Sequence, residues 1–166
     1  SDGKLGRAAT WSQLSPMSDF YYYGQEESNT CGSASSKMVL KFLTGTTYKE
    51  SSIRDAINNL GGATLSNMAT YVNSKQSENI YISKYGATKT TMKNNLYSGI
   101  VTYNAPPVIG IQESTSTGWP YNLNAHAVVV YSVLSDKAKV SIADPWAGYK
   151  GDSTKWFDKS TDDLYT

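Results

Sequence analysis

The sequence predicts an α+β fold, with helices in the N-terminal part of the chain and an antiparallel β-sheet in the C-terminal part. Two observations carry this prediction. Apolar residues recur at helical spacing in several segments that follow residue 30, whereas the later segments are short, rich in Val and Ile, and separated by polar turns. A run of helices followed by a run of strands is typical of α+β proteins, because alternating units would instead build a parallel sheet.

The clearest helix is expected to begin at Cys31. Lys37 and Lys41 fall on its polar side, and Gly45 supplies a C-terminal stop. The apolar positions of this helix are Ala34, Met38 and Phe42, with Val39 and Leu43 beside them. Further helices are expected over about residues 49–60, 65–75 and 90–98, and Thr64 is suited to cap the third helix of the chain.

Strands are expected where Val, Ile and Tyr alternate with polar residues or form short runs. These segments are residues 79–85, 107–111, 126–134 and 139–143, and Trp156 and Phe157 begin another. Residues 135–137 are expected to form a hairpin turn, and the polar, Tyr-rich residues 1–24 are expected to pack over the domain as a mostly extended arm. The chain is thus interpreted as an arm (1–24), a helical part (25–75) and a mainly sheet part (79–146).

Length and charge limit the classes of partner. With 166 residues the chain is expected to form a single domain, residues 1–166, that is large enough to bury a continuous core. Its 15 Lys and Arg residues nearly balance 14 Asp and Glu residues and no basic run occurs, so no nucleic acid is expected as a partner. No apolar stretch approaches the roughly 18–20 residues that span a membrane, so no membrane span is expected.

Cysteine and histidine counts limit the chemistry further. The single cysteine excludes an intramolecular disulfide, and one Cys with one His cannot fill a zinc site without carboxylates, so no cofactor is expected. The charged fraction of only 17% and the 13 tyrosines favour an extracytoplasmic protein. No signal peptide is visible, which is consistent with a mature secreted form. A monomer is expected.

Three residues have the side chains of a cysteine hydrolase. Cys31 and His126 are the single cysteine and histidine, and Asp144 follows His126. A thiol at the first turn of a helix has its pKa lowered by the helix dipole, and an adjacent imidazolium lowers it further. His126 opens one expected strand and Asp144 ends the next, so antiparallel pairing places both at one edge of the sheet. There the carboxylate can orient the imidazole.

Gln25 supplies a fourth group shortly before Cys31. Acyl transfer builds negative charge on the carbonyl oxygen, and a donor aimed at that oxygen lowers the barrier by about 3–4 kcal/mol. The side-chain amide of Gln25 and the backbone N–H of Cys31 are expected to form such an oxyanion hole. Gly32 is expected to let the substrate backbone approach the nucleophile closely.

These motifs resemble a known family. Residues 25–35, in which Gln25 precedes Cys31-Gly32 and a helix, resemble the catalytic segment of papain-like cysteine peptidases. Residues 125–130 and the later Asp144-Pro145 are more specifically similar to the bacteriocin-processing peptidases and their free-standing bacterial relatives. The resemblance covers roughly residues 20–146 and implies a papain-like fold, in which a helical lobe carries the cysteine and a sheet lobe carries the histidine and aspartate.

The resemblance also implies roles and a setting. Cys31 would be the nucleophile, His126 the general base and acid, and Asp144 the orienting acid, with Gln25 as oxyanion donor. The protein would be a secreted or cell-surface bacterial peptidase with a peptide or protein substrate. The chain departs from the family pattern at Ser33, where Pro is common, and at Ala125, where Gly is common. The residues expected to contact substrate are Gly32, Trp119, Ala125 and Trp146.

Other interpretations of the same residues remain open. A lone cysteine is usually a small buried hydrophobic residue, and Asp144 before a proline can simply start a turn. Asn122 or Asn124 could orient the imidazole in place of Asp144. The same thioester chemistry also serves a transglutaminase or a cell-wall amidase, in which the acceptor differs. A non-catalytic binding module of this fold would instead keep Cys31 buried and unreactive.

Overall fold

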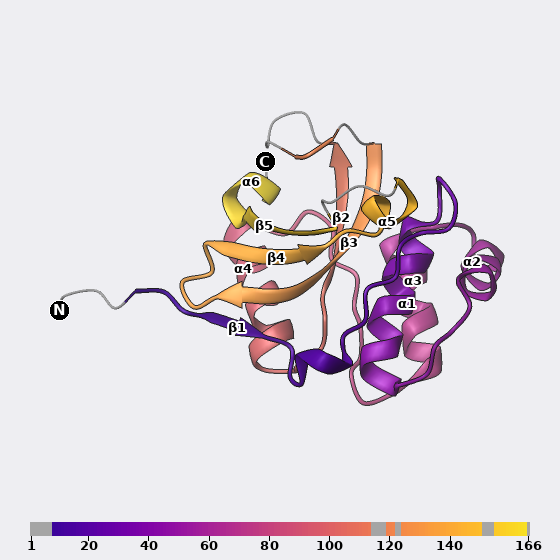
Figure 1. The fold of residues 1–166 in the computed structure, drawn as a ribbon, viewed down its shortest axis with the longest axis horizontal. Coiled ribbons are helices and arrows are strands. Elements are labelled where there is room, and N and C mark those ends of the chain that lie inside the picture. The colour runs from indigo at the N-terminus through magenta and orange to yellow at the C-terminus, as the bar shows by residue number, and fades with distance from the viewer. Residues whose placement is uncertain (1–7, 114–118, 122–123, 151–154, 166) are drawn as a thin grey trace.

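Three helices pack together beside an antiparallel sheet in the computed structural model, which describes residues 8–113, 119–121, 124–150 and 155–165 (Figure 1). The helices of this lobe are α1 (Cys31–Thr44), α2 (Glu50–Asn59) and α3 (Leu65–Lys75). Each lies within about a residue of its expected bounds. Gly45 ends α1 in the left-handed conformation, and Thr64 caps α3 by accepting a hydrogen bond from the backbone N–H of Asn67.

The sheet lobe is built around one long central strand. Strand β3 (Asn124–Leu134) pairs with β4 (Lys139–Ala143), and β4 pairs with β5 (Trp156–Ser160). On its other edge β3 pairs with β2 (Val108–Glu113) and, farther along, with β1 (Trp11–Gln13). All of these pairings are antiparallel. The α+β fold class expected from the sequence is confirmed, with a helical lobe that carries Cys31 and an antiparallel sheet lobe that carries His126.

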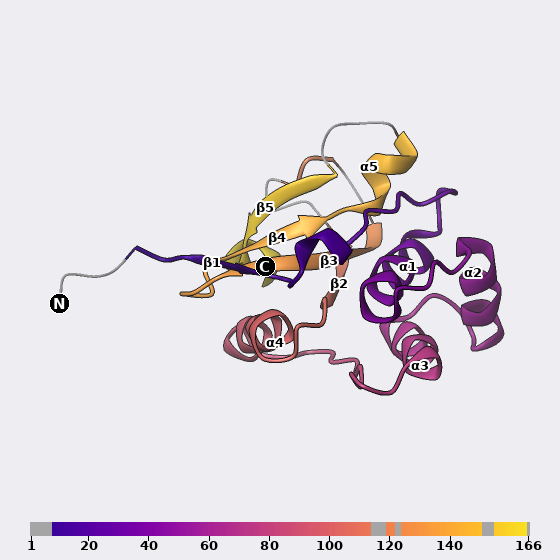
Figure 2. The same ribbon diagram turned by 60° about the horizontal axis from the view of Figure 1, so that its bottom comes forward.

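Buried side chains join the two lobes. Helix α1 packs against β3, and helix α4 (Lys89–Val101) covers one face of the sheet (Figure 2). Met38, Val39 and Leu40 of α1 are fully buried, as are Val128, Val129 and Val130 of β3, and all belong to one core cluster. Because the helix that begins at Cys31 lies directly on the strand that carries His126, this packing brings the predicted site residues together.

The prediction of a strand at residues 79–85 is wrong. This segment has no regular secondary structure and pairs with none of the described strands. Its central residue is instead fixed to α3, because the backbone N–H and C=O of Tyr81 both bond to the side-chain amide of Asn73 at 2.8 Å. Ile80 and Ile82 remain exposed. The alternation of apolar residues therefore did not lead to strand pairing here, and the side chain of Asn73 takes the place of a neighbouring strand.

The N-terminal arm, which was expected only to pack over the domain, contributes a strand to the sheet. Residues 11–13 form β1, which pairs with residues 132–134 of β3, and the following Leu14 is fully buried. A short 3-10 turn, Met17–Asp19, then leads toward the helical lobe. The sequence did not indicate this strand, nor two short helices, α5 (Pro145–Lys150) and α6 (Thr161–Tyr165). Within the described residues, no helix is both long and apolar enough to cross a membrane.

Candidate active site

Cys31 is the first residue of α1 and is partly buried. The backbone N–H of Gly32 points to its sulfur, as expected where the first N–H groups of a helix have no partner within the helix. Ser35, one turn later, donates its hydroxyl to the carbonyl of Ala127 at 3.2 Å. Because Ala127 follows His126 on β3, this bond holds the helix of Cys31 against the strand of His126.

His126 and Asp144 meet at the edge of the sheet where the hairpin places them. In the β3–β4 pairing Val129 faces Ala143, so the start of β3 lies beside the residue that follows β4. His126 Nε2 lies 2.7 Å from Asp144 Oδ1, and both side chains are buried. With Nε2 directed at Asp144, Nδ1 is the ring nitrogen left for the thiol of Cys31, which is within hydrogen-bonding reach of the imidazole.

The electrostatics of this group favour a thiolate and an imidazolium. Burial raises the pKa of the Cys31 thiol, but the hydrogen bond and charge of His126, with two backbone N–H groups, outweigh burial and lower that pKa below its ordinary value. Burial also lowers the pKa of His126. The hydrogen bonds and charges of Asp144 and Cys31 outweigh this effect and raise the pKa of His126 to about 9.

Asp144 has a second structural task. Its Oδ1 accepts the backbone N–H of Trp146 at 3.0 Å, so the carboxylate caps helix α5, whose first residue is Pro145. An aspartate followed by proline suits the N-cap and first position of a helix. The hydroxyl of Tyr22 donates to the Asp144 carbonyl at 2.5 Å. The side-chain carboxylate is therefore tied to the start of α5, whereas the Tyr22 bond reaches the backbone of Asp144 and not its carboxylate.

Tyr121 is a site residue that the sequence analysis missed. Its hydroxyl donates to Asp144 Oδ2 at 2.5 Å and lies 3.1 Å from His126 Nε2. Its ring stacks on Trp146, with 6.0 Å between ring centroids, and is perpendicular to Trp119. Among the 13 tyrosines of the chain nothing local distinguishes this one, because its partners come from the tertiary fold.

Gln25 lies on a segment that is anchored from several sides. Its backbone N–H donates to the carbonyl of Pro145 at 3.0 Å, which ties it to the residue after Asp144. Its side chain is buried, and Nε2 donates one of its hydrogens to the carbonyl of Glu27 at 2.8 Å. Oε1 accepts no hydrogen bond from the described residues. One of the two amide hydrogens thus fixes the side chain on this segment, and a primary amide carries a second hydrogen that it can donate.

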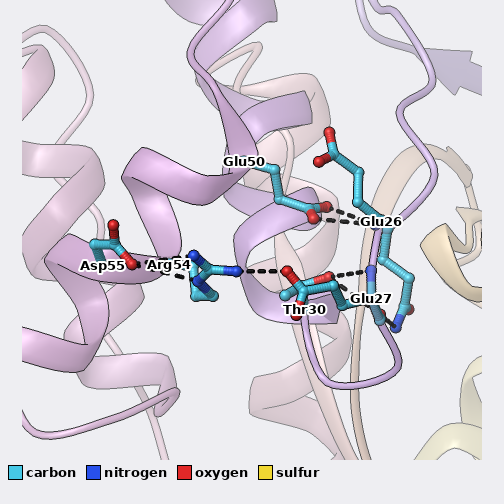
Figure 3. A network of polar contacts seen from close by, with 7 residues as sticks. Glu26, Glu27, Thr30, Glu50, Arg54 and Asp55 are labelled. Carbon is cyan, nitrogen blue, oxygen red and sulfur yellow. Dashed lines mark hydrogen bonds and ion pairs between the residues drawn. The ribbon is translucent and has the colours of Figure 1, made fainter.

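Charged residues from α2 hold the rest of that segment (Figure 3). Both carboxylate oxygens of Glu50 accept the backbone N–H of Glu26, at 3.0 and 3.2 Å, and Arg54 forms an ion pair with Glu27. Thr30 closes the turn, because its hydroxyl both accepts from the backbone N–H of Glu27 and donates to the carbonyl of Glu27, each at 3.1 Å. These contacts connect Gln25 to Cys31 through a fixed loop.

Replacing Glu50 by alanine is expected to lower the free energy of unfolding by about 1–3 kcal/mol, because the backbone N–H of Glu26 would lose its buried acceptor. Glu50→Gln keeps one acceptor oxygen and should lose less. Burial raises the pKa of Glu50, so Gln also avoids burying a charge. Urea unfolding measures the effect, with Asp55→Ala, an exposed carboxylate on the same helix, as the control. Equal stability of the Glu50→Ala and Asp55→Ala proteins would contradict the anchoring role.

The residues expected to contact substrate lie in different surroundings. Gly32 is buried, and a Cβ there would lie 2.9 Å from Met68 Sδ, so glycine lets α1 and α3 pack closely. Trp119 is buried against Phe157, while Trp146 is half-buried beside Tyr121. Ala125 is exposed next to His126. Their contacts with substrate remain predictions, and Asn122 and the side chain of Asn124 lie outside what the structure describes.

Ala125 adopts a backbone conformation that favours glycine, with φ of 49°. A residue with a Cβ is destabilised there by about 1–2 kcal/mol, partly offset by the larger unfolded-state entropy of glycine. We therefore expect Ala125→Gly to raise the free energy of unfolding by roughly 0.5–1 kcal/mol. Thermal unfolding checks this, with Ala138→Gly as the control, an exposed alanine outside the left-handed region that should lose stability. A loss of stability in Ala125→Gly would contradict the strain.

The described side chains do not gather a metal site: no group of three or more His, Cys, Asp or Glu residues is placed to hold an ion there. The site brings together an imidazole hydrogen-bonded to a carboxylate and a thiol within hydrogen-bonding reach of that imidazole. A buried amide, that of Gln25, lies on the anchored loop that precedes the thiol. Comparison with known protein families gives a match to the Peptidase_C39 like family over residues 17–163, which includes all of these groups. No curated protein matches the chain.

Proposed function

Because the chain belongs to the Peptidase_C39 like family, a papain-like cysteine peptidase family related to the bacteriocin-processing peptidases, we propose that it hydrolyses peptide bonds with Cys31 as nucleophile. The observation that carries the proposal is the buried hydrogen bond of His126 to Asp144, with the Cys31 thiol within hydrogen-bonding reach of the same imidazole. In this proposal the single cysteine reacts with substrate and is not a buried packing residue, since the pKa of its thiol is lowered and its side chain is only partly buried.

The reaction begins with the thiolate–imidazolium pair. The Cys31 thiolate attacks the carbonyl carbon of the scissile peptide, and the negative charge moves to the carbonyl oxygen. The Gln25 amide and the backbone N–H of Cys31 at the start of α1 stabilise that oxyanion. His126 then gives its proton to the leaving amine as the tetrahedral intermediate collapses to a thioester.

The second half of the reaction regenerates the enzyme. Neutral His126 takes a proton from a water molecule, and the resulting hydroxide attacks the thioester carbonyl. The C–S bond breaks, the acid product leaves, and the thiolate–imidazolium pair is restored. Asp144 holds the imidazole through Nε2 in both halves, so that Nδ1 faces the thiol, the leaving amine and the water in turn.

Incubation of the protein with a mixture of unstructured peptides, followed by mass spectrometry of the products, tests the proposal. Wild-type protein is expected to yield new peptide termini, and Cys31→Ala protein none. Cleavage by the Cys31→Ala protein would reject the thiol mechanism. A parallel incubation with a primary amine separates hydrolysis from acyl transfer, because amide adducts in place of free acids would indicate a transglutaminase. An unreactive thiol and unchanged peptides would favour a binding module.

A further inference from the structure

We propose that Tyr121 is a positioning residue of this site, whose hydroxyl clamps the Asp144 carboxylate and the His126 imidazole in the orientation that directs the imidazole at Cys31. The inference rests on the function proposed above. The observation behind it is a hydroxyl placed between two members of the series, 2.5 Å from Asp144 Oδ2 and 3.1 Å from His126 Nε2.

The carboxylate of Asp144 needs more than one donor to be fixed. It is fully buried, and its Oδ1 accepts from His126 Nε2 and from the backbone N–H of Trp146. Among the described residues, Oδ2 accepts a hydrogen bond from the Tyr121 hydroxyl. With donors on both oxygens, the carboxylate cannot turn about its own axis without breaking a charge-assisted hydrogen bond.

The imidazole is constrained in the same way. When His126 is protonated, its Nε2–H faces two oxygen atoms, Asp144 Oδ1 at 2.7 Å and the Tyr121 hydroxyl at 3.1 Å. The hydroxyl can accept from the imidazolium while its own proton goes to the carboxylate. Rotation of the ring would break both contacts, so Nδ1 stays directed at the sulfur of Cys31.

The position and protonation of the phenol suit this task. Burial, together with the hydrogen bond and charge of Asp144, raises the pKa of Tyr121, so the hydroxyl keeps its proton and remains a donor. The ring is fixed by stacking on Trp146 and by a perpendicular contact with Trp119. A Tyr121→Phe substitution keeps the ring that makes these contacts and removes the hydroxyl alone.

The groups that face His126 come from three elements. They are Cys31 at the start of α1, Asp144 directly after β4, and Tyr121 in the segment before β3. Without the hydroxyl, the imidazole samples orientations in which it no longer pairs with the thiolate. The apparent pKa of the thiol should therefore rise in Tyr121→Phe, and a smaller fraction of the enzyme should be competent at neutral pH.

The experiment is the pH dependence of Cys31 alkylation by iodoacetamide, together with kcat and KM for a cleaved peptide. The matched control is Tyr22→Phe, which also loses a 2.5 Å hydrogen bond to Asp144, but to its backbone carbonyl. Tyr121→Phe is expected to raise the midpoint of alkylation and to lower kcat about tenfold with KM unchanged, as for loss of one hydrogen bond to a charged group. Tyr22→Phe should keep the wild-type midpoint.

A wild-type midpoint in Tyr121→Phe, beside a lowered midpoint in the wild type itself, overturns this inference and leaves the proposed function standing. An ordinary thiol pKa in the wild type rejects the proposed function instead. Should Tyr121→Phe not fold, NMR of the wild type decides, because the chain has a single histidine. A Tyr121 hydroxyl proton close to the His126 Nε2–H is expected below the pKa of the imidazole, and its absence there contradicts the clamp.

Discussion

His126→Ala protein is expected to lose peptide hydrolysis by about 10²–10⁴-fold, and its Cys31 thiol is expected to titrate near the roughly 8.5 of a free cysteine or above it. The imidazole supplies the largest of the effects that lower the thiol pKa, while burial of the sulfur raises it. Removing the imidazole leaves burial opposed only by backbone N–H groups. No other imidazole can replace the one that is lost, since the chain has no second histidine.

The pH profile of the wild type follows from the same pair. The thiolate forms as the pH rises through the lowered pKa of Cys31, and the imidazolium is lost as the pH rises through about 9. Hydrolysis, which needs both, should therefore rise and then fall with pH, whereas alkylation, which needs only the thiolate, should not fall above pH 9.

Iodoacetamide labelling across the pH range and peptide hydrolysis measure these two curves in wild type and in His126→Ala. The acidic limb of alkylation is expected to move to higher pH in the variant, and the alkaline limb of hydrolysis near pH 9 should disappear. Circular dichroism establishes that the variant is folded. An alkylation midpoint that does not respond to loss of His126 would mean that Cys31 and His126 do not form an ion pair, and the proposed mechanism would fail.

The sequence predicted the parts of this fold that depend on short-range pattern. Helix α1 was predictable because its apolar residues recur every turn and Gly45 ends it, and these features do not depend on distant segments. His126 and Asp144 could be paired in advance because a hairpin with a turn at residues 135–137 fixes which ends of two strands meet. The positions of Cys31, His126 and Asp144 could therefore be predicted from helix periodicity and hairpin pairing, which are local rules.

The parts that the sequence did not predict depend on partners that are distant in the chain. Strand β1 has three residues and exists because β3 offers an open edge far along the sequence. Residues 79–85 alternate like a strand, but the side chain of Asn73 satisfies the backbone of Tyr81 in place of a neighbouring strand. Tyr121 belongs to the same class, because its role depends on two residues that only the tertiary fold brings to its hydroxyl.

Gln25→Ala is expected to lower kcat for peptide hydrolysis by about 10²–10³-fold while leaving the pH dependence of Cys31 alkylation unchanged. The reason for the split is that an oxyanion donor acts only when charge develops on the carbonyl oxygen, and alkylation of a thiolate builds no such oxyanion. The amide is well placed for preorganisation, because it is buried, one N–H hydrogen is held by the Glu27 carbonyl, and its backbone N–H is bonded to Pro145.

The Gln25 amide lies on a loop that is held in place before substrate binds. The same loop is held by Glu50 and Arg54, so the donor does not have to be ordered at the moment of reaction, which is the condition under which such a group is most effective. Gln13→Ala, at an exposed glutamine of β1, is the control and should match wild type in both reactions. If Gln25→Ala hydrolyses peptide at the wild-type rate, the amide is no oxyanion donor. If it slows alkylation and hydrolysis equally, its effect is on the thiolate pair, and the oxyanion assignment fails by that route.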